Sequence, residues 1–253
     1  MDELSTTIFL SAAGLLIGSF VTVVAHRVPR GESVVGGRSH CPACGAQIAA
    51  YDNVPVFSWA LLGGKARCCG AAISPRYPLT EFAVAILYGG TTVLLWGDAA
   101  EIALGLVFVT MLVAITLTDL ERRIIPNKIL LAASILAVGI VVATDPSSLL
   151  ERTIAAAAAG GLLFAAALAY PRGMGMGDVK LAATMGLFLG RDVGPAILVA
   201  LLAGSCVGLA MIARHGAAAR KRAIPFGPFL ALGGLVGMLA GDELIEWYLS
   251  TFS

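Results

Sequence analysis

The chain has 253 residues, of which 58% are hydrophobic and only 13% are charged. A mean hydropathy of +0.89 excludes an ordinary soluble protein of this length. The net charge of +1 gives no indication of a nucleic-acid partner, and we expect none. The apolar residues recur in runs of about 20, the length that crosses a bilayer as a helix. The composition therefore predicts an all-α, polytopic integral membrane protein; the alternating pattern of an outer-membrane barrel is absent.

The first apolar run covers residues 4–25 and could be mistaken for a secretory signal. Asp2 and Glu3 precede it in place of a basic segment, and 22 residues exceed the apolar core of a signal peptide. We therefore expect residues 1–25 to form a retained first transmembrane helix. The composition changes abruptly at residues 26–78, which hold six Arg or Lys residues, four Cys and no run long enough to span. This segment is predicted to be a small soluble insert.

Seven further apolar runs follow, separated by short polar loops, so that about eight transmembrane helices are expected in all. These runs cover residues 79–97, 100–118, 127–144, 153–170, 179–190, 193–213 and 224–249. The run 179–190 is short, since its 12 residues rise only about 18 Å as a helix. It must be tilted, begin below the membrane surface, or re-enter without crossing. Residues 79–253 are expected to form one membrane-embedded domain.

The distribution of charge predicts the orientation of these helices. With eight crossings, 15 of the 17 Lys and Arg residues fall on one side of the membrane, because only Arg152 and Arg191 fall on the other. The positive-inside rule assigns the basic side to the cytoplasm. That side holds the Cys-containing insert and the loops 119–127, 171–178 and 214–223, and both termini are then expected outside.

Two acidic residues lie at the cytoplasmic edge of predicted spans. Asp119 follows the apolar stretch 106–118, and Asp178 stands between Gly173-Met-Gly175-Met-Gly177 and the short run 179–190. A carboxylate at that depth is costly unless it is paired, hydrated or functional, so each is a candidate functional residue. The alternatives are that Asp119 is merely solvated beside Arg122 and Arg123, and that Asp178 caps a helix.

The two carboxylates together indicate a specific chemistry. In a pair that shares one proton, the ionised member deprotonates water and the protonated member polarises a carbonyl group. This is the chemistry of an aspartic protease. Gly175 and Gly177 place no side chain beside Asp178, and Gly-rich backbone can approach an extended peptide and pair with it as a strand.

Several short motifs follow one another along nearly the whole chain. They are Gly18 to Arg27 in the first span, Cys41-Pro-Ala-Cys44, Asn53-Val-Pro55, Ile73 to Glu81, Asp119 before Ile-Pro-Asn127, and Gly175-Met-Gly177-Asp178-Val-Lys180. In this order the motifs resemble those of the prepilin peptidases, membrane-embedded aspartic proteases of the Gly-x-Gly-Asp type.

The resemblance implies that Asp119 and Asp178 are the catalytic pair. It implies cleavage of the leader of type IV prepilins and pseudopilins after a Gly, at the cytoplasmic face of the bacterial inner membrane. In many members the same protein then methylates the new N-terminus with S-adenosylmethionine, which is therefore an expected cofactor. Lys180, with Arg122 and Arg123, is expected to stabilise a carboxylate or attract the substrate; the alternative is an interfacial topology marker.

The cysteines of the insert indicate a metal site with an irregular ligand set. Cys41 and Cys44 have the spacing of half a structural zinc knuckle, and disulfides are disfavoured in the cytoplasm. The family commonly has a second Cys-x-x-Cys before its Ile-Ser-x-Arg-Tyr-Pro segment, and alignment there places Ala66 at the first position and Cys69 at the second. The open alternatives are a fourth ligand from Cys68 or His40, a weakened site, or no zinc. The missing cysteine bears on methyl transfer and not on cleavage.

Three other functions fit some of these features. A transporter could use two intramembrane carboxylates to couple protons or ions, although transport sites are usually near the midplane. A zinc-knuckle scaffold would need no paired acids. A Gly-x-Gly-Asp protease for other membrane peptides, such as preflagellins, is the nearest alternative.

Overall fold

The computed structural model describes residues 2–34, 36, 39–170, 173–216 and 224–252. Within these ranges the chain is almost entirely helical, and strand pairing is limited to the isolated bridges His40 to Gln47 and Lys65 to Ala72. The expected all-α class is therefore confirmed. The chain divides into two compact units, Met1–Asp98 and Ala99–Ser253.

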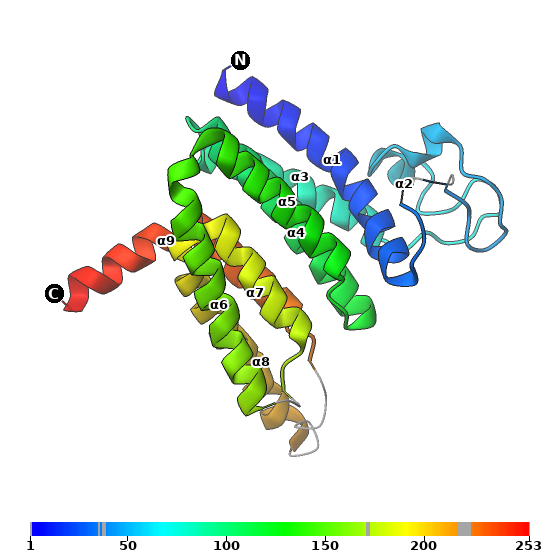
Figure 1. Cartoon of the computed structure of the whole chain (residues 1–253). Helices are drawn as coiled ribbons and strands as arrows, with labels where there is room; N and C mark the ends of the chain where they lie inside the picture. The colour runs from blue at the N-terminus through cyan, green and yellow to red at the C-terminus, as the bar shows by residue number, and fades with distance from the viewer. Residues whose placement is uncertain (1, 35, 37–38, 171–172, 217–223, 253) are drawn as a thin grey trace. The chain divides into compact units, whose positions relative to one another are not determined.

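The first unit consists of two long helices and the insert between them. Its helices are α1 (Glu3–Arg27), α2 (Phe57–Leu61) and α3 (Arg76–Leu94), with short 3-10 turns η1 (Val28–Arg30) and η2 (Ala50–Asn53). Helices α1 and α3 pack side by side (Figure 1). Their backbones approach closely because α1 has glycines at the contact: a Cβ built at Gly18 would lie 2.6 Å from the Cα of Glu81. The Cys-containing segment lies after the first helix, as expected.

The described residues of the second unit form six helices (Figure 1), which share one apolar core. They are α4 (Ala99–Arg122), α5 (Asn127–Thr144), α6 (Leu149–Ala169), α7 (Met176–Leu189), α8 (Val193–His215) and α9 (Gly227–Phe252), with 3-10 turns η3 (Pro146–Ser148) and η4 (Gly190–Asp192). Phe108, Leu112 and Ile115 form a buried stripe along α4, with spacings of four and three residues. Leu181 and Met185 of α7 belong to the same core.

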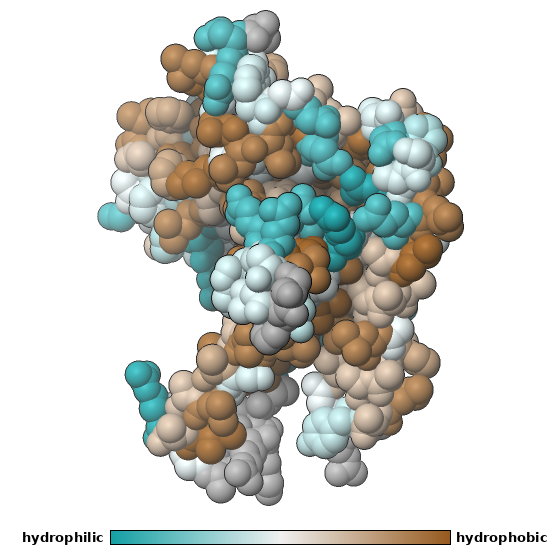
Figure 2. All heavy atoms as spheres, turned by 90° about the vertical axis from the view of Figure 1, so that its left-hand side faces the viewer, coloured by the Kyte–Doolittle hydropathy of each residue, from teal (hydrophilic) through white to brown (hydrophobic). Residues whose placement is uncertain are grey.

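The outer surfaces of these helices are apolar. Leu131 and Ile135 of α5 are each 63% exposed, and brown apolar side chains make up much of the face drawn in Figure 2. Six helical segments among the described residues are long and apolar enough to cross a membrane. An exposed apolar surface of this extent is stable in lipid and not in water, so the chain is an integral membrane protein. The count of eight crossings stays a prediction.

The short predicted run corresponds to α7, a helix of 14 residues. Its last turn receives a side chain from α6: the Arg152 guanidinium donates to the carbonyl oxygen of Phe188 and forms an ion pair of 2.7 Å with Glu101. Arg152 also donates to the hydroxyl of Ser148. A helix end leaves backbone carbonyls without intrahelical partners, and a cationic side chain satisfies one of them here.

Candidate active site and metal centre

Asp119 lies in the last turn of α4, and only 5% of its surface is exposed. It follows Ile115 by four residues and so continues the buried stripe of that helix. Its Oδ2 accepts a hydrogen bond of 2.8 Å from the backbone N–H of Gly227. The cation of Arg123, four residues further on, interacts electrostatically with it. Asp119 is therefore buried and held in place by protein groups, unlike a solvated side chain at a helix end.

Asp178 lies in the first turn of α7, and 9% of its surface is exposed. Leu181, Ala182 and Met185 continue the same buried face at helical spacing. Its Oδ2 accepts a hydrogen bond of 3.0 Å from the N–H of Gly175, the residue that caps α7. Asp178 thus caps its helix, which was the alternative to a functional role. It is also buried on the face that packs into the core.

The structure brings these two carboxylates together. Helices α4 and α7 are in contact, and the carboxylates of Asp119 and Asp178 are near enough to interact electrostatically. Because each acid continues the core stripe of its own helix, the packing that forms the core also buries both acids on helices that are in contact. Two like charges in a buried site cannot both be ionised cheaply, so such a pair tends to share one proton.

Gly177 and Gly175 occupy different positions around Asp178. Gly177 is in the first turn of α7, where a Cβ would lie 2.9 Å from the Cβ of Ile125 in the segment after α4. Gly175 has extended backbone, with φ of −86° and ψ of 152°, and its N–H is already bonded to Asp178. Gly177 thus permits close approach between the two segments that carry the acids.

Lys180, the fifth residue of α7, extends to the start of α5. Its Nζ donates a hydrogen bond of 3.1 Å to the Oδ1 of Asn127, the first residue of that helix. The side chain is exposed. Lys180 therefore links α7 with α5 at the end of the unit that holds both acids.

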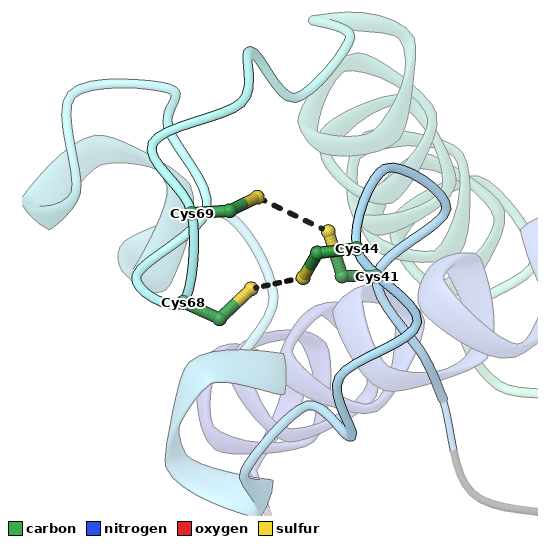
Figure 3. Close-up of side chains that lie close together, drawn as sticks. All are labelled: Cys41, Cys44, Cys68 and Cys69. Carbon is green, nitrogen blue, oxygen red and sulfur yellow. Dashed lines mark hydrogen bonds between the residues drawn. The ribbon is translucent and has the colours of Figure 1, made fainter.

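The cysteines of the first unit form a compact cluster. The four Sγ atoms of Cys41, Cys44, Cys68 and Cys69 all lie within 4.8 Å of one another and point inward from two loops (Figure 3). The Sγ atoms of Cys44 and Cys68 are 3.4 Å apart, and those of Cys41 and Cys69 are 3.7 Å apart. Tetrahedral zinc with Zn–S bonds of about 2.3 Å needs sulfur atoms separated by roughly 3.8 Å. The four thiols therefore fit a zinc ion, and His40 is not part of this group.

The two loops have the same backbone pattern. In the first, the N–H of Gly45 donates to the carbonyl of Cys41, and the N–H of Cys41 donates to Ala46. In the second, the N–H of Gly70 donates to the carbonyl of Ala66, and the N–H of Ala66 donates to Ala71. Ala66 is therefore the structural counterpart of Cys41, and Cys69 that of Cys44. The fourth sulfur comes instead from Cys68, inside the turn.

The surroundings of these cysteines favour different protonation states of the thiol. Backbone N–H groups of Cys44 and Ala43 bond to the sulfur of Cys41 and lower the pKa of its thiol to about 6. The neighbouring sulfur of Cys44, together with desolvation, raises the pKa of the Cys68 thiol to about 12. N–H groups directed at a sulfur favour the thiolate, which is the form that binds metal. The surroundings of Cys41 thus favour its thiolate, whereas those of Cys68 favour its neutral thiol.

Two further residues have structural roles that the sequence did not suggest. Glu81 of α3 is 7% exposed; it accepts a hydrogen bond of 2.7 Å from the N–H of Val56 and another from the hydroxyl of Ser19. Val56 has a φ of 60°, a costly value for a β-branched residue, so this contact holds a strained turn of the insert. The second is Gly227, through its bond to Asp119. In the sequence, Glu81 stands out only as the last residue of the motif that begins at Ile73, and Gly227 only because it precedes Pro228.

The chain matches two family models. Residues 12–95 match the bacterial peptidase A24 N-terminal domain, and residues 106–213 match the type IV leader peptidase family. No solved structure gave a significant match.

Curated relatives extend over nearly the whole chain. A prepilin leader peptidase/N-methyltransferase of Aeromonas salmonicida is 33% identical over 94% of this chain and 91% of its own length. The protein of the same name from Bacillus subtilis is 32% identical over 93% of this chain and 95% of its own length. The one from Pseudomonas aeruginosa is 31% identical, with coverage of 93% and 91%. This chain therefore belongs to the type IV leader peptidase family.

Proposed function

We propose that this protein is a membrane aspartic endopeptidase that removes the leader of type IV prepilins or pseudopilins after a Gly. The observation that carries the proposal is the pair of buried acids on contacting helices, Asp119 in the last turn of α4 and Asp178 in the first turn of α7, with Asp119 near enough to act electrostatically on Asp178. The family and the names of the relatives in the preceding section support the substrate class. Both acids come from residues 79–253, the segment we propose as the peptidase domain.

In the proposed mechanism one carboxylate is ionised and takes a proton from water while the other, protonated, donates to the scissile carbonyl oxygen. The bond between Gly175 and Asp178 keeps the latter in its capping orientation. Gly177 lets Ile125, and with it the end of α4, come close enough for both acids to act on one water. We assign the exposed Lys180, which lies at the end of the unit that holds both acids, to substrate recognition.

We also propose that the new N-terminus is methylated with S-adenosylmethionine, as the names of the relatives suggest. The methyl group would pass from the sulfonium of that cofactor to the free amine, which releases a proton. Cys41, Cys44, Cys68 and Cys69 would hold a structural zinc ion that fixes the two loops of the insert; the spacing of their sulfur atoms supports this.

The proposed location is the inner membrane, with the insert and the acids on the cytoplasmic side and both termini outside. A prepilin inserted with its basic leader in the cytoplasm presents its cleavage junction at this membrane edge. The excess of basic residues on one side supports this orientation.

Co-expression with a prepilin that has a Gly-Phe junction tests the peptidase assignment. We expect wild-type protein to release the leader, and Asp119→Asn or Asp178→Asn to abolish cleavage, because Asn keeps the shape but cannot share the proton. Asp145→Asn, at an exposed position of the same unit, is the matched control and should cleave normally. Intact mass and N-terminal sequencing of the pilin report cleavage and any added methyl group. Cleavage by either active-site variant would refute the dyad.

The same assay separates the rival functions. If correctly inserted wild-type protein leaves the prepilin intact but cuts a preflagellin junction, the substrate class changes and the dyad remains. If it cuts neither, the peptidase proposal fails, and a proton- or ion-coupled transporter becomes the favoured function.

A further inference from the structure

The start of α9 contacts Asp119 directly. Gly227 is the first residue of that helix, and its buried N–H donates to the Oδ2 of Asp119 across 108 residues of sequence, at 2.8 Å. The first N–H groups of a helix have no intrahelical acceptor and carry partial positive charge, so a carboxylate is a favourable partner. This bond holds Oδ2 of Asp119 and so limits rotation of the whole carboxylate.

The absence of a side chain at Gly227 is also required. A Cβ built there would lie 2.7 Å from the Oδ2 of Asp119 and 3.1 Å from both its Cβ and Cγ. Real Cβ atoms essentially never come within 3.0 Å of another heavy atom. Any other residue at this position would push the carboxylate out of its present place.

The helix that supplies this N–H is itself fixed by packing. Leu230, one turn into α9, is fully buried, and the rings of Phe226 and Phe229 contact at a tilt of 37°, with centroids 6.2 Å apart. Further along, a Cβ at Gly234 would lie 3.0 Å from the ring of Phe108, so α9 and α4 are in close contact there. The start of α9 therefore cannot shift easily to accommodate a displaced Asp119.

We propose that Gly227 is a positioning residue for the reaction. Its N–H fixes the carboxylate of Asp119 within the site that Asp119 forms with Asp178, and its lack of a side chain provides the space that Asp119 occupies. The inference rests on the proposed peptidase function and adds a third segment of the chain, the start of α9, to a site otherwise formed by α4 and α7.

The test compares two glycine substitutions in the full-length protein reconstituted in lipid. Gly227→Ala is matched by Gly194→Ala, near the start of α8, where a Cβ meets no atom within 4 Å. With a synthetic prepilin junction peptide, we expect Gly227→Ala to lower kcat about 100-fold with KM little changed, because small misplacement of a catalytic group has that order of effect. Gly194→Ala should cleave at the wild-type rate.

Two further readouts distinguish positioning from a general loss of structure. An N–H bond favours the ionised carboxylate, so without it the limb of the pH–rate profile that reports Asp119 should move to higher pH. Replacing Gly227 by glycolic acid in cell-free synthesis removes the N–H and adds no side chain. It should lower kcat and shift the profile in the same direction. This second variant decides the matter if Gly227→Ala does not fold.

The outcomes separate the two proposals. If wild-type protein fails to cleave any junction peptide, the proposed function fails. If wild-type protein cleaves, and the folded Gly227 variants cleave with unchanged kcat and pH profile, the positioning role of Gly227 is refuted while the peptidase assignment stands.

Discussion

At the scale of single residues, the contact between Gly177 and Ile125 determines how closely α7 approaches the segment after α4. A Cβ at position 177 would lie 2.9 Å from the Cβ of Ile125, an atom tied to the backbone that cannot rotate away. We therefore expect Gly177→Ala to move Asp178 away from Asp119 and lower the cleavage rate by about 100-fold. The rate is measured with a junction peptide in reconstituted protein.

Gly161→Ala in α6 is the control for this change, since a Cβ at position 161 meets nothing within 4 Å. It makes the same chemical change in a helix and should leave cleavage intact. Equal rates for both variants would show that close packing at Gly177 does not matter for the reaction.

The acids themselves could be found from sequence, but their partners could not. Asp119 and Asp178 can be recognised in the sequence because each lies at one end of an apolar run. A charge at that depth in the membrane is costly unless it has a function. The N–H donor of Gly227 belongs to a segment 108 residues from Asp119, and no local pattern says which loop meets which helix end. The same is true of Glu81 and Val56, which lie 25 residues apart.

At the scale of elements, Arg152 holds the end of α7 to α6 and α4. Its side chain is 14% exposed, with partners on Glu101 and Phe188. Arg152→Met keeps an unbranched apolar stem but removes the ion pair with Glu101 and the hydrogen bond to the Phe188 carbonyl, at a cost of about 2 kcal/mol. For a chain of this size we expect a fall in Tm of about 4 to 8 °C in detergent.

Arg191→Met is the matched control, because the ion pair of Arg191 with Asp242 is exposed, with 64% and 61% of the two side chains accessible. Exposed pairs contribute little to stability, so its Tm should stay close to that of the wild type. A similar Tm for both variants would contradict the role given to Arg152.

Because Ala66 is the structural counterpart of Cys41, we expect that Ala66→Cys can supply the fourth zinc ligand in place of Cys68. Cys68→Ser removes the fourth thiol, and the full-length protein should then bind zinc more weakly. Adding Ala66→Cys restores a regular Cys-x-x-Cys with Cys69, at the position that corresponds to Cys41, so the double variant should bind one zinc ion tightly again. Zinc content under a competing chelator measures both, with Cys206→Ser as the control outside the cluster. Failure of Ala66→Cys to recover binding would count against the equivalence of the two loops.

Helices were the most predictable elements, because a run of about 20 apolar residues has few other stable forms in a membrane. Each of the eight predicted runs lies within a helix or overlaps one. The cysteine loops were less predictable. The sequence left the fourth ligand open between Cys68 and His40, whereas the tight turn at Gly70, with a φ of 71°, directs both Cys68 and Cys69 into the cluster.

At the scale of the whole molecule, the proposed activities draw on different parts of the chain. Asp119, Asp178 and Gly227 all belong to the unit Ala99–Ser253, whereas the four cysteines belong to Met1–Asp98. We therefore expect Cys41→Ser with Cys44→Ser to impair methyl transfer while cleavage continues. Mass spectrometry of the pilin distinguishes a cleaved, unmethylated product from an uncleaved one. Loss of cleavage in a properly inserted variant would mean that the peptidase depends on the insert.

The 14 residues of α7 have a consequence for the surrounding lipid. At 1.5 Å per residue they rise about 21 Å, against a hydrocarbon layer of about 30 Å. If α7 crosses the membrane, this hydrophobic mismatch leaves at least one of its ends below the headgroups, and Asp178 stands in its first turn. A pilin junction would then have to unwind within the leaflet to reach the acids. Acyl chain length would thus act on the reaction rate, and bilayers of shorter lipids would bring interfacial water closer to Asp178.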